Sequence, residues 1–220
     1  MTDIIWMTAA ELSAAYAAGT LSPVEATHAV LARINAVDPV LNAFCHRDDE
    51  TVLAQAADSE ARWRAGTARS PLEGVPVSIK DLMWLKGWPT RYGSLTTSDE
   101  PNPEDDPAVA HLRAAGCVFT GKVTTPEFGN SGVTDSPLTG PTVNPWDIGR
   151  TPGGSSGGSV AAVSSGCGPL SLGSDGGGSI RTPASFTNLV GHKPTFGRVP
   201  QAPGEHFGRL SASGPIARTV

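Results

Sequence analysis

The chain has 220 residues, of which 39% are hydrophobic and 17% are charged, a composition that excludes an intrinsically disordered protein. Its formal net charge is −5 and it has no cluster of Lys and Arg, so nothing attracts a nucleic-acid backbone or an anionic membrane surface. No segment approaches the ~18 consecutive apolar residues of a membrane span, and no basic, apolar leader opens the chain. We therefore expect a soluble globular protein without a nucleic-acid or membrane partner.

The first 66 residues predict a helical layer. Ser22 and Pro23 supply an N-cap hydroxyl and an N1 proline, and the following residues 24–37 place apolar side chains on one helical face. A second amphipathic helix is expected near residues 50–65. We predict that this layer packs within the same domain as the rest of the chain.

From residue 67 onward, strand and helix patterns alternate. The short apolar run GVPVSI, residues 74–79, precedes the polar pair Lys80 and Asp81 and is typical of a buried strand. A helix is expected at residues 107–115, a strand at 117–121, a helix at 160–166 and a strand at 169–174. This order predicts an α/β fold in which residues 67–220 form the core.

The three cysteines, Cys45, Cys117 and Cys167, are odd in number, far apart and never in a CxxC arrangement. That usage predicts reduced thiols and a cytoplasmic location rather than disulfides or a zinc site. The five histidines show no HExxH or HxH spacing, so we expect neither a metal nor another cofactor.

Two further motifs, one typical of nucleotide binding and one typical of a catalytic nucleophile, match this sequence only in part. GCVFTGKV, residues 116–123, nearly matches a phosphate loop, but it lacks the final hydroxyl residue, and its strand-like part lies between the two glycines rather than before them. GxSxG occurs centred on Ser155 or on Ser156, but the preceding NPWDIGRTP contains helix and strand breakers where a nucleophile elbow needs a strand. Both interpretations are disfavoured.

The run TPGGSSGGSV, residues 151–160, has the composition of a flexible linker. However, eleven glycines in residues 149–178 interleave with the apolar runs VAAV and PLSL, which a tether does not need. Glycines around ordered elements indicate close backbone approach or unusual torsions. The second cluster, SDGGGSIR at residues 174–181, places three glycines before Ser179, a layout suited to oxyanion stabilisation by backbone N–H groups.

The stretch GRTPGGSSGGSVAAVSSGCGPLSLGSDGGGSIRTPASFTNLVGHKPTFGRVP, residues 149–200, resembles the signature region of the amidase signature enzymes. GVPVSIKD and AAGCVFTGKVTTPEFGN resemble the segments that precede it in that family, so the similarity extends from about residue 21 onward. The resemblance implies hydrolysis of a carboxylic amide by a Ser-Ser-Lys triad and an α/β/α fold with a mixed β-sheet.

Carried over by position, the resemblance makes Ser179 the nucleophile, Ser155 the bridging serine and Lys80 the base. It also implies a cis peptide bond before Ser155. The oxyanion hole would use the backbone N–H groups of Gly176, Gly177, Gly178 and Ser179, whereas Asp175 and Arg181 are expected to hold the turn by hydrogen bonds. A lysine can serve as a base only as an uncharged amine, so Lys80 must be buried.

Members of the family are much longer than this chain, so the resemblance implies that the C-terminal half of the fold is absent from these 220 residues. A shortened chain, a shortened gene, and a partner that supplies the rest remain alternative explanations. Two functions follow. The first is an amidohydrolase acting on a small amide. The second is an inactive or partner-dependent component, similar to one polypeptide of a glutamine-dependent tRNA amidotransferase, working as a homo-oligomer or with a second chain.

Overall fold

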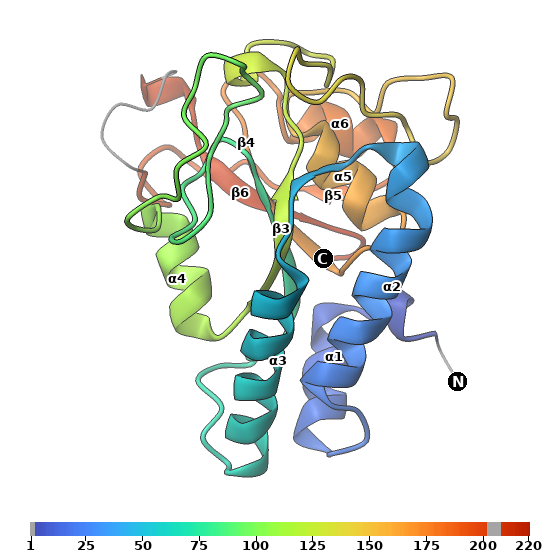
Figure 1. Cartoon of the computed structure of the whole chain (residues 1–220), viewed down its shortest axis with the longest axis vertical. Helices are drawn as coiled ribbons and strands as arrows, with labels where there is room; N and C mark the ends of the chain where they lie inside the picture. Colours follow the sequence, from blue (N-terminus) through green and yellow to red (C-terminus); the bar gives the residue numbers. More distant parts are fainter. Residues whose placement is uncertain (1–2, 202–207) are drawn as a thin grey trace.

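A computed structural model describes residues 3–201 and 208–220 of the chain (Figure 1). The helices in chain order are α1 (Ala9–Ala17), α2 (Pro23–Leu41), α3 (Asp49–Arg64), α4 (Pro107–Ala115), α5 (Gly157–Ser164) and α6 (Arg181–Phe186). Single 3-10 turns are η1 (Ile4–Trp6), η2 (Glu127–Gly129) and η3 (Gly208–Leu210). The strands are β1 (Phe44–His46), β2 (Pro76–Lys80), β3 (Val118–Val123), β4 (Leu170–Ser174), β5 (Val190–Gly191) and β6 (Ser213–Ala217).

The strands form one mixed sheet in the order β1-β3-β2-β4-β6-β5. The central strands β3, β2 and β4 are parallel, whereas β1, β6 and β5 pair antiparallel to their neighbours. In Figure 1, α4 lies to the left of β3, and α2 and α5 lie to its right. This arrangement confirms the predicted α/β class with a mixed sheet flanked by helices.

The start of α2 follows directly from its sequence. Ser22 accepts a hydrogen bond from the N–H of Glu25, and the Glu25 side chain accepts one from the N–H of Ser22, so a capping box closes the helix N-terminus. Pro23 occupies the first turn, where its missing N–H costs nothing. The helix continues past the expected end at residue 37 to Leu41 and stops at Asn42, which adopts a left-handed conformation.

Three strands lie where the sequence indicates none: β1, the two-residue β5, which pairs with β6, and β6 itself. β1 is only three residues long, lies within the first 66 residues that we expected to be helical, and pairs with β3. β6 contains Gly214 and Pro215, which are unfavourable in strand interiors, yet it pairs with both β4 and β5. All three strands depend on neighbours distant in sequence, so a local pattern does not reveal them.

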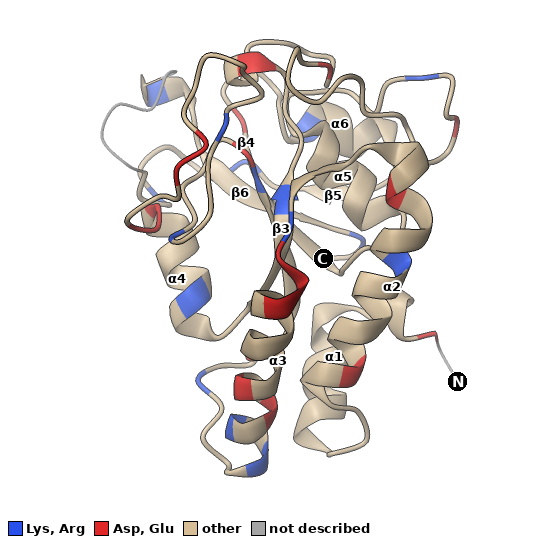
Figure 2. Ribbon diagram, viewed as in Figure 1, with Lys and Arg blue, Asp and Glu red and all other residues tan. Residues whose placement is uncertain are grey.

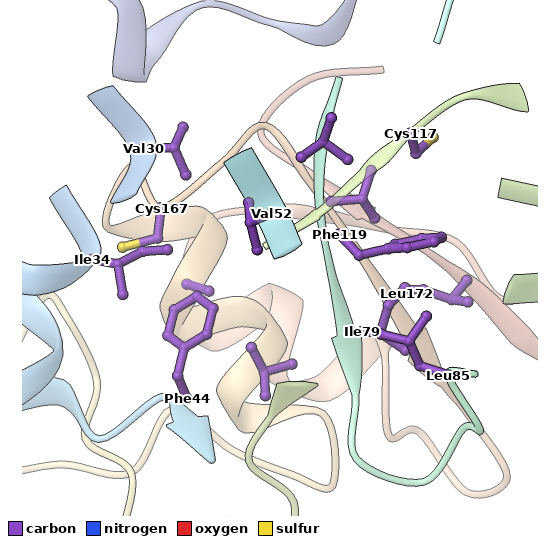
Figure 3. Close-up of a cluster of buried hydrophobic side chains, with 14 of the residues drawn as sticks. Val30, Ile34, Phe44, Val52, Ile79, Leu85, Cys117, Phe119, Cys167 and Leu172 are labelled. Carbon is purple, nitrogen blue, oxygen red and sulfur yellow. The ribbon is translucent and has the colours of Figure 1, made fainter. Parts of the chain in front are cut away.

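The main hydrophobic core lies between the sheet and the helices (Figure 3). Val30 and Ile34 of α2 and Val52 of α3 approach it from the N-terminal layer, and Ile79 and Phe119 come from β2 and β3. These side chains are all at most 2% exposed. Residues 1–66 and the later segments therefore share one core.

Figure 2 shows Lys and Arg residues and Asp and Glu residues scattered over the helices, strands and loops of the described ribbon. The longest helix, α2, has 19 residues and includes charged side chains on its surface. Across residues 3–201 and 208–220, none of the helices combines the length and the apolar character that crossing a bilayer requires.

Candidate active site

Lys80 is the last residue of β2, and its side chain is fully buried. Its Nζ donates hydrogen bonds to Oγ of Ser155 at 2.6 Å and to Oγ of Ser174 at 3.0 Å. Ser174 is the last residue of β4, the parallel neighbour of β2. Because parallel strands end at the same edge of a sheet, β2 and β4 bring the amine and this hydroxyl together, at the edge where α/β proteins place their sites.

Ser155 lies in the turn that enters α5, and the peptide bond between Gly154 and Ser155 is cis, as the resemblance implies. The turn is tightly packed. A Cβ atom on Gly157 would overlap the side chain of Thr134, and one on Gly158 would overlap the backbone of Thr124. The Gly/Ser run is therefore a buried structural turn, and the linker interpretation is wrong.

Ser179 follows the glycine row and is partly exposed. Its backbone carbonyl accepts a hydrogen bond from the N–H of Ser156 at 3.1 Å, so the two serine clusters meet one residue away from Ser155. The Oγ of Ser156 also donates to the carbonyl of Ser174 at 3.2 Å. The segments that carry Lys80, Ser155 and Ser179 thus converge, although they lie far apart in the sequence.

Asp175 organises the glycine row. Its carboxylate accepts hydrogen bonds from the N–H groups of Gly178 and Ile180, at 2.7 and 3.2 Å, and from the Arg181 guanidinium at 2.8 and 3.0 Å. Burial opposes the charge, but the Arg181 guanidinium and these backbone donors outweigh it and lower the pKa of Asp175 to about 2. The expected structural role of Asp175 and Arg181 is confirmed.

The backbone donors of the glycine row are not equivalent. The N–H of Gly178 is already bound by Asp175, which differs from our expectation that it faces an oxyanion. In the part of the chain that the structure describes, the N–H groups of Gly176, Gly177 and Ser179 have no hydrogen-bond acceptor. An oxyanion site in this turn would therefore rest on these three groups.

A second buried lysine lies in the neighbouring strand and was not anticipated from the sequence. Lys122 of β3 is fully buried and forms an ion pair with Asp81, with Nζ and Oδ1 2.9 Å apart. Its Nζ also donates to the carbonyl of Met83 at 2.8 Å and to Oγ1 of Thr90 at 2.7 Å. A lysine inside the apolar run VFTGKV was the one available signal. Through these contacts, the Lys122 side chain holds the loop that follows Lys80 in place.

The alternative site interpretations are not supported by the fold. Gly116 is the left-handed C-cap of α4, and residues 118–123 form β3, so GCVFTGKV spans a helix end and a strand rather than a phosphate loop. The GxSxG run follows an irregular segment instead of a strand. Among the described residues, no group of three or more His, Cys, Asp and Glu side chains could hold a metal ion.

Comparison with protein families gives a consistent result. A family profile described as Amidase matches residues 25–220. The chain is 47% identical over 221 aligned residues to the A component of the glutamyl-tRNA(Gln) amidotransferase of Salinispora tropica, an alignment that covers 100% of this chain and 45% of that protein. It is 44% identical to an acylamidase of Rhodococcus erythropolis, covering 99% of this chain and 46% of the relative.

Among solved structures, a bacterial aryl acylamidase of the amidase signature enzymes superimposes with a TM-score of 0.90 at 33% identity. That alignment covers 97% of this chain and 45% of the aryl acylamidase. The chain therefore spans about half the length of the relatives that it matches.

Proposed function

The chain belongs to the amidase signature family, and on that basis we propose that it carries the catalytic apparatus of an amidohydrolase that cleaves a carboxylic amide through an acyl-enzyme. The observation that carries this proposal is the 2.6 Å hydrogen bond between the buried Nζ of Lys80 and Oγ of Ser155. A serine hydroxyl becomes a nucleophile only when a neighbouring base removes its proton, and this pair provides such a base.

In the proposed cycle, Ser179 Oγ attacks the amide carbonyl carbon and transfers its proton to Ser155, while Ser155 gives its own proton to the uncharged amine of Lys80. The C–N bond then breaks, and the protons return through Ser155 to the departing amine nitrogen. In the second half, water attacks the acyl-enzyme ester along the same proton path and releases the acid and free Ser179. No redox change or added co-reactant other than water is required.

Negative charge develops on the carbonyl oxygen during both attacks. The N–H groups of Gly176, Gly177 and Ser179 are the donors proposed to stabilise it, and Gly178 supports them through Asp175. One oxyanion donor is worth about 10²- to 10³-fold in rate, so the conformation of this turn should matter greatly.

The substrate class is a small carboxylic amide, and aliphatic, aryl, peptide C-terminal and cyclic amides all contain the C(=O)–N unit on which these groups act. Another polypeptide is the proposed partner, because the relative that is 47% identical is one component of an amidotransferase. The cysteines Cys45, Cys117 and Cys167 are free thiols, which supports a cytoplasmic location.

A second candidate function is a component of an amidotransferase, favoured by the 47% identity to the A component of a glutamyl-tRNA(Gln) amidotransferase. The same serine chemistry would then release ammonia from an amide for use by another polypeptide of the assembly. This candidate differs from the first in requiring a partner polypeptide for activity.

The decisive experiment combines turnover with active-site labelling. We expect the chain to hydrolyse p-nitroacetanilide and to react with a fluorophosphonate at Ser179, as located by mass spectrometry of the labelled peptide. Ser179→Ala should abolish both signals, whereas Ser185→Ala, a change of an exposed serine on α6, should leave them intact. Undiminished turnover in Ser179→Ala would refute the assignment. A monodisperse chain that gains activity only with a second polypeptide would favour the amidotransferase component.

A further inference from the structure

Ser174 is a second hydroxyl partner of Lys80 and has no part in the proposed proton path. Its Oγ lies 3.0 Å from Nζ of Lys80, while Ser155 Oγ lies 2.6 Å from the same nitrogen. All three side chains are buried, with exposed fractions of 0% for Lys80, 2% for Ser155 and 7% for Ser174. We propose that Ser174 is a positioning residue that orients the Lys80 amine toward Ser155, an inference that rests on the proposed function.

The valence of the amine explains why Lys80 needs a hydrogen-bond acceptor in addition to its contact with Ser155. An uncharged amine has two N–H groups and one lone pair, and only the lone pair can take a proton. In the ammonium form, Nζ donates to Ser155 Oγ. In the uncharged form that acts as the base, the lone pair accepts the Ser155 proton along the same contact, so an N–H group must point elsewhere and find an acceptor, because a buried donor without a partner is costly. Ser174 Oγ provides that acceptor, so it holds the amine in the orientation that receives the proton.

Ser174 is itself firmly held. It is the last residue of β4 and pairs with Ser213 of β6. The Ser174 carbonyl accepts a hydrogen bond from Ser156 Oγ at 3.2 Å. The Ser174 N–H donates to Ser156 Oγ at 3.4 Å. Ser174 therefore connects Lys80 to the turn that carries Ser155, so a displacement of this turn should also displace the Lys80 amine.

The same strand offers a matched control. Ser171 of β4 is also buried, and its Oγ is 2.8 Å from Oγ of Ser78, which lies two residues before Lys80 on β2. This pair bridges the same two strands through hydroxyl groups, and none of its hydrogen bonds involves Lys80. Ser171→Ala removes a buried hydroxyl from the same interface without removing a partner of the amine.

The kinetic test measures kcat/KM for p-nitroacetanilide from pH 5 to pH 10 in the full chain, with circular dichroism to verify folding. We expect Ser174→Ala to lower the plateau by about tenfold, a part of what a positioned general base contributes. The acid limb should move to lower pH, because the lost oxygen stabilised the ammonium more than the amine. Ser174→Thr, which keeps the hydroxyl, should restore both, and Ser171→Ala should change neither.

A second measurement does not depend on turnover. The chain has four lysines, Lys80, Lys86, Lys122 and Lys193, so 13Cε-lysine labelling gives few NMR signals, and Lys80→Met identifies that of Lys80. The midpoint of the Lys80 titration should move to lower pH in Ser174→Ala and stay in place in Ser174→Thr and Ser171→Ala. If Ser174→Ala does not fold, Ser174→Cys, with a side chain of similar size and a poor acceptor, replaces it.

The outcomes separate the two proposals. If the unaltered chain cleaves no amide and Ser179 does not react with the fluorophosphonate, the proposed function fails, and the titration alone decides the role of Ser174. If the titration midpoint of Lys80 is the same in Ser174→Ala as in Ser171→Ala, the proposed positioning role of Ser174 is wrong. A failure of Ser174→Thr to restore the midpoint would also overturn it.

Discussion

The guanidinium of Arg181 donates two hydrogen bonds to the carboxylate of Asp175, and this ion pair closes the turn that presents Ser179. Asp175 is fully buried, whereas more than half of the Arg181 side chain is exposed, 56%. The carboxylate also binds the N–H groups of Gly178 and Ile180. The pair therefore fixes the backbone on both sides of the proposed nucleophile.

Replacing Asp175 by Asn should lower kcat/KM for an amide by about 10²-fold, because a small displacement of the oxyanion donors is enough to cause such a loss. The free energy of unfolding should fall by about 1.5–3 kcal/mol, the range found for a hydrogen bond to a charged group. Asp147→Asn is the control, since Asp147 forms an exposed pair with Arg150, and its replacement should have little effect on the free energy of unfolding. Equal effects of the two substitutions would contradict the prediction.

Acid should destabilise the protein through Glu73. Burial of this carboxylate raises its pKa, but hydrogen bonds from Arg69, Arg62 and Ser59 outweigh burial and lower the pKa to about 2. The stabilisation is complete above the pKa of a free Glu, about 4.3, and is lost as the pH falls through about 2.

Urea unfolding measured between pH 6 and pH 2.5 tests this expectation. The free energy of unfolding should decline below about pH 4, and Glu73→Gln should flatten the decline while lowering stability at pH 6. A parallel decline in both proteins would show that Glu73 does not contribute to it. Glu100→Gln, a change of an exposed carboxylate, serves as the control.

Substitution of Gly158 should be severe although it adds only a methyl group. Its Cβ would overlap the backbone N of Thr124 and the carbonyl of Ala43, neither of which can rotate away. We expect Gly158→Ala to lower the free energy of unfolding by about 1–3 kcal/mol and to displace the Ser155 turn, with loss of turnover. Gly132→Ala, where a Cβ meets nothing within 4 Å, should have little effect. Thermal unfolding of both variants compares the two sites.

Removal of the Lys122 amine should leave Asp81 as an unpaired buried charge. Lys122→Met is therefore expected to lower the free energy of unfolding by about 3–5 kcal/mol. In a chain that already carries Asp81→Asn, Lys122→Met should lower the free energy of unfolding by much less, because no buried carboxylate is then left without its partner. Additive effects in this double-mutant cycle would show that the pair is not coupled. Lys86→Met, at an exposed position, should be nearly neutral.

Much of the fold was predictable because its signals are local. The N-cap hydroxyl of Ser22 with the N1 proline Pro23, the proline at the start of α4 and the short apolar runs of β2, β3 and β4 each specify an element through its own residues. The strands β1 and β6 have no such signal, because they are short or contain glycine and proline, and pairing with distant strands stabilises them.

The candidate site was only partly predictable. Lys80, Ser155 and Ser179 were chosen by resemblance, and the structure brings Lys80 and Ser155 into contact, while the catalytic roles stay predictions. The contact of Ser174 with Lys80 depends on the pairing of β2 with β4, and the use of the Gly178 N–H depends on where Asp175 lies. Neither relationship is encoded in a short stretch of sequence.

The pairing of β2 with β4 also has a consequence for how the protein is made. Ile79 of β2 pairs with Leu172 of β4, so more than ninety further residues must be synthesised before β2 can pair with β4. A growing chain on the ribosome can form α2, α3 and the β2–β3 pair well before β4 emerges. The contact between Lys80 and Ser174 can therefore form only after β4 has been synthesised, and shorter nascent chains lack this part of the proposed site.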